Sequence, residues 1–351
     1  MRPGKRSYIL LIVALAASML SAPSCSRAPE KIIEDSKFFM GTVVQIKVSI
    51  DPAKIDEARA KEAINKAFNE INRIEDVYSV YKDTSEISRI NRLRKNERLQ
   101  ISDGVLNLIQ KTLDYSKRTD GAFDITVKPL VDLWARARQA NKPPDEYDIK
   151  RALDHVGYKN IVLDKVIRTI HFKKEGMGID LGGAAKGYAV DRAVRILEES
   201  GIDNALINSG GDMYCLGKRT SRELWNVGIQ HPRDRNRLFL EIRLKDKAID
   251  TSGDYERYFV VDGKRYSHII DPRTGYPIGD NIVSASVIAS DSTVSDILAT
   301  ALCVLGEKGF DMIKGEPGCI DAVLVKEDAG RLTVKMSEGI RKRYDISQEH
   351  L

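Results

Sequence analysis

The chain has 351 residues, of which 42% are hydrophobic and 30% are charged, so it holds enough apolar material for a folded core. Its net charge at pH 7 is +5, and Arg2, Lys5 and Arg6 contribute three of these charges, which leaves +2 for the remainder. A balance this close to neutrality gives no electrostatic basis for binding nucleic acid.

The first 25 residues are typical of a targeting segment. The basic start precedes an apolar run, Ile9 to Leu20, that is too short to cross a bilayer and suits a signal peptide. Cys25 follows at the place of a bacterial lipidation cysteine, although Ala22 stands where such sites usually have Leu. We therefore expect a lipid anchor at Cys25 that holds the protein in the bacterial cell envelope, on the periplasmic face of a membrane. Cleavage nearby without lipidation, or an uncleaved anchor, is the alternative.

Periodicity predicts the elements that follow. Residues 26–37 are charged and aperiodic, so we expect a tether there. Apolar residues at three- and four-residue spacing predict helices over residues 54–77, 102–117, 186–200 and 293–305. Short apolar runs predict strands over residues 39–50, 161–163, 166–172, 205–208, 225–229, 238–244, 248–250, 258–261, 266–270, 282–289 and 322–325.

The order of these elements indicates the fold class. Helices and strands are mixed without regular alternation, which favours an α+β fold over a doubly wound sheet. We expect mixed sheets packed with helices in one compact unit over residues 38–337, followed by a charged, frayed tail over residues 338–351.

The run from Asp180 to Asp191 joins a strand end, a glycine pair and Lys186 to the start of a helix. Glycines let a backbone approach a ligand closely, and a helix N-terminus with a lysine suits phosphate. Gly187 follows the lysine where a P-loop needs Ser or Thr, so the run is not a P-loop. From this segment alone, a phosphate cradle and a plain tight turn both stay open.

Two further positions could carry chemistry. Asp296 and Thr300 lie four residues apart on one face of the last predicted long helix, and their oxygens suit Mg²⁺ rather than zinc or copper. Taken alone, this pair is better explained as structural. His268 lies where a strand runs into an Asp-Pro-x-x-Gly turn and could serve as a base, although a structural histidine is the alternative.

Tyr81 could stack on an aromatic ring or could pack in the core, and Tyr78 is a near alternative for the stacking role. The small-residue loops after Asn208 and Thr251 could line a ligand with backbone N–H groups or could be plain turns.

Taken in order, these segments resemble the ApbE family, the FAD:protein FMN transferases. The resemblance spans roughly residues 38–335 and is carried by seven motifs: Met40-Gly41-Thr42, Ser79-x-Tyr81-x-x-x-Ser85-Glu86-Ile87, Gly121-Ala122-Phe123-Asp124, Asp180-Leu181-Gly182-Gly183-x-Ala185-Lys186-Gly187-Tyr188, Asn208-x-Gly210-Gly211-Asp212, His268-x-x-Asp271-Pro272-x-Thr274-Gly275 and Asp296-x-x-x-Thr300-Ala301.

The resemblance implies an α+β fold, FAD as substrate, Mg²⁺ as cofactor, and transfer of FMN from FAD to a Ser or Thr hydroxyl of an acceptor protein with release of AMP. It implies that His268 is the catalytic base, with Asp180 as the other candidate. The metal would be held by the carbonyl of Gly183 and the side chains of Asp296 and Thr300. The FAD contacts would be Met40, Tyr81, Ala122, Phe123, Asp124, Asp180, Lys186 and Ile270.

The expected acceptor is a redox protein, such as a membrane subunit of a sodium-pumping or related electron-transfer complex. Two other functions remain open. A Mg²⁺-dependent FAD pyrophosphatase would use the same metal site with water as acceptor, giving FMN and AMP. A non-catalytic FAD-binding lipoprotein is the third reading, but a mere binder has no need of Asp296 and Thr300 beside a pyrophosphate.

Overall fold

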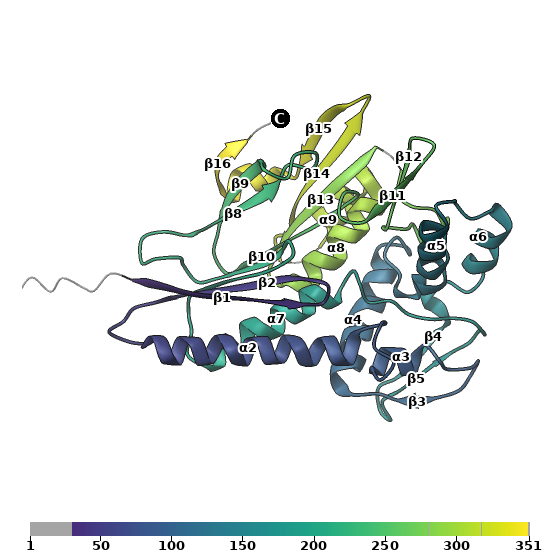
Figure 1. Ribbon diagram of the computed structural model, residues 1–351, viewed down its shortest axis with the longest axis horizontal. Coiled ribbons are helices and arrows are strands. Elements are labelled where there is room, and N and C mark those ends of the chain that lie inside the picture. The colour runs from purple at the N-terminus through teal and green to yellow at the C-terminus, as the bar shows by residue number, and fades with distance from the viewer. Residues whose placement is uncertain (1–29, 280, 317, 350–351) are drawn as a thin grey trace, which may run out of the picture.

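The computed structural model describes residues 30–279, 281–316 and 318–349 (Figure 1). The expected signal segment and Cys25 lie outside these residues. Among the helices described, none combines the length and the apolar character that a membrane span requires.

Four sheets and a set of helices make up the described chain. The strands are β1 (Lys31–Phe39), β2 (Thr42–Ile50), β3 (Leu99–Gln100), β4 (Ile161–Asp164), β5 (Thr169–Phe172), β6 (Ala205–Ser209), β7 (Asp212–Leu216), β8 (Trp225–Gln230), β9 (Leu238–Leu244), β10 (Lys247–Gly253), β11 (Tyr258–Val261), β12 (Lys264–Ser267), β13 (Ile282–Ala289), β14 (Asp321–Asp328), β15 (Arg331–Met336) and β16 (Asp345–Glu349). The helices are α2 (Glu57–Tyr78), α3 (Glu86–Ile90), α4 (Asp103–Arg118), α5 (Lys128–Ala140), α6 (Glu146–Leu153), α7 (Ala185–Glu199), α8 (Ser292–Leu305), α9 (Gly309–Lys314) and α10 (Glu338–Arg343), with short 3₁₀ turns at Ile125–Val127, Tyr158–Asn160 and Gly306–Lys308.

The largest sheet has eight strands in the order β1-β2-β6-β7-β10-β13-β14-β15, and every neighbouring pair in it is antiparallel. The alternation seen in the sequence decides which face of β2 is inside, because Val44, Ile46 and Val48 are all fully buried. In Figure 1, α2 runs along this part of the sheet, and its apolar stripe packs in the same core cluster.

Helices α7 and α8 cover the middle of the sheet on the same side as α2. On the opposite side, a core cluster joins the sheet to a smaller sheet of order β16-β9-β8. Every residue of β13 is buried, because it lies between these two layers. The mixed sheets and packed helices confirm the expected α+β class.

The two chain segments expected to lack structure are both folded, so those expectations are wrong. Residues 31–37, assigned to a tether, belong to β1, which pairs with β2 along its whole length, from Lys31 opposite Ile50 to Phe39 opposite Thr42. β1 is an edge strand and is mostly exposed, so it needs no alternating apolar pattern. Hydrophobic periodicity therefore could not predict it.

At the other end, residues 338–349 were expected to fray but form α10 and β16, and β16 pairs with β9. Arg343 holds this segment to strand β14 by donating from Nε and Nη2 to Asp321 Oδ2 at 2.8 and 2.6 Å. Asp321 is fully buried, so Arg343 of this charged segment pairs with a buried carboxylate and does not point only to solvent.

A third core cluster joins α5 and α6 to the β11-β12 hairpin. Trp134 of α5 stacks on Tyr266 with ring centroids 5.5 Å apart and donates its indole N–H to Gly275 O at 2.8 Å. Strand β12 ends at Ser267 rather than at the predicted residue 270. His268 therefore lies where the chain leaves the hairpin.

Candidate active site

The N-terminus of α7 crosses α8 at Gly187. A Cβ on Gly187 would lie 2.2 Å from Ser292 O, closer than any real contact, so only glycine permits this approach. The Gly187 N–H donates to Asp296 Oδ2 at 3.1 Å. Gly187, which excludes a P-loop, therefore has a structural role: it lets the buried carboxylate of Asp296 contact the first turn of α7.

The three predicted metal ligands meet at this crossing. A Cβ on Gly183 would lie 2.9 Å from Thr300 Oγ1, and Asp296 is one turn away on the same helix face. Thr300 Oγ1 is also 3.2 Å from Ser252 Oγ on β10. One carboxylate, one hydroxyl and one carbonyl are hard oxygen ligands, and this donor set fits Mg²⁺. Over the described residues, no group of three or more His, Cys, Asp and Glu side chains is placed to hold a metal.

Two further carboxylates lie behind this set. Asp212 pairs with Lys186 Nζ, and its side chain is almost fully buried. Asp250 has no exposed surface and accepts hydrogen bonds from the Ser292 hydroxyl, the Ser295 hydroxyl and the Met213 N–H.

Burial raises the pKa of Asp296 to about 7, and the charge of Asp212 adds to this effect. Burial also raises the pKa of Asp250 well above its usual value, and the charges of Asp212 and Asp296 raise it further. Burial alone would lower the pKa of Lys186, but the charges of Asp212 and Asp296 raise it above its usual value. The expected contact of Lys186 with FAD stays a prediction, because in this structure its charge balances buried carboxylates.

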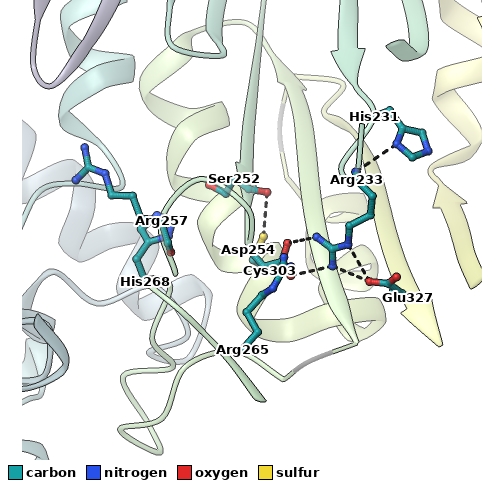
Figure 2. Close-up of polar contacts among 9 residues, drawn as sticks. All are labelled: His231, Arg233, Ser252, Asp254, Arg257, Arg265, His268, Cys303 and Glu327. Carbon is teal, nitrogen blue, oxygen red and sulfur yellow. Dashed lines mark hydrogen bonds and ion pairs between the residues drawn. The ribbon is translucent and has the colours of Figure 1, made fainter. Parts of the chain in front are cut away.

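His268 is oriented by the backbone of Arg257. The His268 N–H donates to Arg257 O at 3.0 Å, and Nδ1 lies 3.1 Å from the same oxygen (Figure 2). Only a protonated nitrogen can donate to a carbonyl, so Nδ1 carries the proton and Nε2 of the neutral ring is free to accept one. Loss of solvation lowers the pKa of His268 to about 4, and the charge of Arg257 acts in the same direction. The imidazole is therefore neutral at pH 7, as a general base must be.

Asp180 precedes the glycine pair and is partly exposed. Its N–H donates to Ile125 O at 2.7 Å, and its Oδ1 accepts the Gly182 N–H at 2.7 Å. Loss of solvation raises the pKa of Asp180. The structure thus holds Asp180 in a turn, and its role as a base stays a prediction.

The expected contacts in the Gly121–Asp124 loop fall into two kinds. Ala122 and Phe123 are buried, and Phe123 Cε2 would be 3.2 Å from a Cβ on Gly183, so this ring lies at the metal set. The Asp124 carboxylate is fully engaged, since Oδ1 accepts from the N–H and hydroxyl of Thr126 and Oδ2 accepts from the Tyr158 N–H. We infer that Asp124 shapes the loop. A cavity of about 260 Å³ opens beside this loop.

The remaining expected FAD contacts differ in exposure. Ile270 is buried and pairs with Pro277 in an isolated bridge. Met40 has a φ of +52° in the turn between β1 and β2, and its N–H donates to Glu75 Oε2 at 3.0 Å. Tyr81 is 82% exposed, which rules out core packing and leaves its ring open to a ligand. The near alternative, Tyr78, is buried and packs against Tyr188 with ring centroids 5.4 Å apart.

Sequence reasoning missed two residues of the site. Asp250 lies on β10, directly before the small-residue loop that begins at Thr251 and includes Ser252. Arg257 gives its carbonyl to His268 from the far end of the same loop. The Thr251 loop and the His268 motif are close in sequence, which was a signal that they could form one site. This closeness could not indicate which atoms are in contact.

Two relatives and two solved structures are similar to this chain over most of its length. A Klebsiella pneumoniae protein named FAD:protein FMN transferase is 34% identical over 300 residues, 85% of this chain and 90% of the relative. A Vibrio cholerae protein of the same name is 35% identical over 305 residues, 85% of this chain and 88% of the relative.

The crystal structure of the ApbE protein from Thermotoga maritima matches with a TM-score of 0.80 at 35% identity, over 89% of this chain and 99% of that one. The flavin transferase ApbE from Vibrio cholerae matches with a TM-score of 0.79 at 28% identity, over 90% and 99% of the two chains. The model of the ApbE family matches residues 40–324. With sequence and fold in agreement over this range, the chain belongs to the ApbE family.

Proposed function

We propose that this protein is a Mg²⁺-dependent FAD:protein FMN transferase. The observation that carries the proposal is the meeting of Gly183, Asp296 and Thr300 at the crossing of α7 and α8. The relatives from Klebsiella pneumoniae and Vibrio cholerae bear the name of this activity.

In the proposed reaction, His268 Nε2 takes the proton from a Ser or Thr hydroxyl of the acceptor protein. The hydroxyl oxygen forms a bond to the phosphorus of the FMN half of FAD, and the P–O bond to AMP breaks, so AMP leaves. A Thr hydroxyl is a weak nucleophile, which is why a neutral imidazole with its Nδ1 proton held by Arg257 O matters.

The metal set supplies charge neutralisation. Mg²⁺ held by the Gly183 carbonyl, Asp296 and Thr300 would stabilise negative charge on the pyrophosphate oxygens. The charges of the paired Asp212 and Lys186 act on the buried Asp296 in opposite directions: Asp212 raises the pKa of Asp296, and Lys186 lowers it.

We place the protein on the periplasmic face of a bacterial membrane, anchored through a lipid on Cys25, with a membrane redox subunit of a sodium-pumping or related complex as acceptor. The basic, apolar and cysteine-containing start of the sequence supports this placement. Metabolic labelling with a tagged fatty acid tests the anchor, since a Cys25→Ser variant should lose the label.

The activity itself is tested with residues 26–351, which include all of β1. The protein is mixed with FAD, Mg²⁺ and a candidate redox subunit, and the products are separated on a denaturing gel. A fluorescent band at the acceptor's mass supports the transferase. FMN found only free in solution would indicate the pyrophosphatase instead, and FAD that stays bound and unchanged would indicate a carrier.

A further inference from the structure

The Arg257 side chain has no ion-pair partner among the described residues. It is exposed, and its guanidinium makes no hydrogen bond or ion pair with any residue that the structure describes. Figure 2 shows it extending away from the polar network around Asp254, on the same side as His268. Such a group is free to bind a ligand.

The Arg257 guanidinium lies beside the turn between β1 and β2. A Cβ on Gly41 would lie 3.2 Å from Arg257 Nη2, so the guanidinium rests against the turn that carries Met40. Its charge reaches both His268 and Asp180, whose pKa values it lowers. Arg257 thus lies among three residues expected to contact FAD or the reacting hydroxyl.

The loop that carries Arg257 is anchored firmly. Arg233 forms a two-point pair with the buried Asp254, with Nη1–Oδ1 at 2.8 Å and Nη2–Oδ2 at 3.0 Å, and also contacts Glu327 Oε2 at 2.7 Å (Figure 2). Arg265 adds a contact to Asp254 Oδ2 at 3.3 Å. Two arginines near Arg257 are therefore occupied by carboxylates, and only Arg257 of the three presents its charge to the site.

The lysine that was predicted to contact FAD already has carboxylate partners, since Lys186 is paired with Asp212 and its charge also interacts with Asp296. A planar guanidinium binds phosphate oxygens at two points, which suits Arg257 to this task. Resting on the proposed function, we infer that Arg257 binds a phosphate of FAD and makes the site select FAD over flavins without phosphate.

Equilibrium binding to the full folded unit tests the inference. The affinities of FAD and riboflavin are measured by calorimetry in EDTA, where no turnover occurs. We expect Arg257→Ala to weaken FAD binding by about 10-fold or more, the loss of a charge-assisted hydrogen bond, and to leave riboflavin binding unchanged. Arg257→Lys keeps the charge without the two-point geometry and should lose less. The carbonyl that holds His268 survives in each variant.

Arg138→Ala is the matched control, because Arg138 is also exposed and its charge also reaches His268. It should bind FAD as the wild type does. Equal losses in both alanine variants would mean a diffuse field effect, and equal losses of FAD and riboflavin would mean a structural role; either result overturns the inference.

Normal FAD binding by Arg257→Ala with loss of transfer alone would also overturn it, because the arginine would then serve the acceptor protein. Failure of the proposed function gives a different pattern. The wild type would release or transfer no FMN, yet the contrast between FAD and riboflavin binding would persist.

Discussion

At the scale of single residues, the site depends on carboxylates and an imidazole whose surroundings change their proton affinity. Asp296 has a pKa of about 7 because burial and Asp212 disfavour its charge. The pKa of His268 is lowered to about 4 for the opposite reason, because loss of solvation disfavours a cation. Perturbed groups of this kind gather at functional sites.

Asp296→Asn should abolish turnover while FAD binding is largely kept. The amide oxygen can still accept the Gly187 N–H, but it brings no charge to the metal set. FMN release with Mg²⁺ and FAD affinity in EDTA separate the two effects. Full activity in this variant would show that the metal is held elsewhere.

The low pKa of His268 predicts a pH-dependent stability. The unfolded chain binds a proton at His268 with the usual pKa of 6.5, whereas the folded chain does so only near 4. The folded state therefore loses stability as the pH falls from 6.5 towards 4, and is unaffected by this group above 6.5. The melting temperature of the wild type, measured relative to that of His268→Gln, should fall as the pH is lowered from 6.5 to 4. A gap that does not change over this range would contradict the low pKa.

At the scale of elements, the crossing of α7 and α8 is what brings the predicted metal ligands together. Asp191 of α7 accepts the Ser292 and Thr293 N–H groups at 2.7 and 2.9 Å, so it caps α8 from the neighbouring helix. Together with Gly187, this contact fixes both the distance and the angle between the two helices.

Gly187→Ala should therefore separate the helices. The added methyl group meets the Ser292 carbonyl, which belongs to a helix backbone and cannot rotate away. We expect a destabilisation of about 1–3 kcal/mol, as for other overpacked sites, together with loss of metal-dependent turnover. Urea unfolding measures the first effect. Gly315→Ala is the control, since its nearest neighbour would lie at an ordinary 3.5 Å.

At the scale of the whole molecule, the two ends of the described chain close the structure. β1 extends one edge of the large sheet, and β16 completes the smaller sheet that covers its far face. Arg343 links the C-terminal segment to the buried Asp321 on β14.

Arg343→Ala should weaken this closure, because Asp321 would keep the Ser337 hydroxyl as a partner but lose its cation. A buried carboxylate left without its cation destabilises a fold by about 3–5 kcal/mol, and the half-exposed arginine reduces our expectation to roughly 1–2 kcal/mol. Chemical denaturation provides the measurement. Lys342→Ala, which breaks an exposed pair with Glu338, should change little; a similar loss in both would contradict the specific role of Arg343.

Much of the fold could be predicted from local patterns. The strands at Leu238–Leu244, Tyr258–Val261 and Ile282–Ala289 are confirmed with their predicted bounds. Their signal is a run of apolar or alternating residues, which depends only on near neighbours in sequence. β1 and β16 were missed because an edge strand is stabilised by its partner and needs no apolar pattern of its own.

The α+β class and the family resemblance could be read from the sequence alone, because residue types at fixed spacing carry both. The metal ligands that the resemblance implies stay a prediction. Only the tertiary structure decided which charges are free. Lys186 faces Asp212 from 26 residues away. The Arg257 guanidinium has no ion-pair partner among the described residues, whereas Arg233 and Arg265 both pair with Asp254. Electrostatic partners are chosen by distance in space, and chain folding sets those distances without regard to separation in sequence.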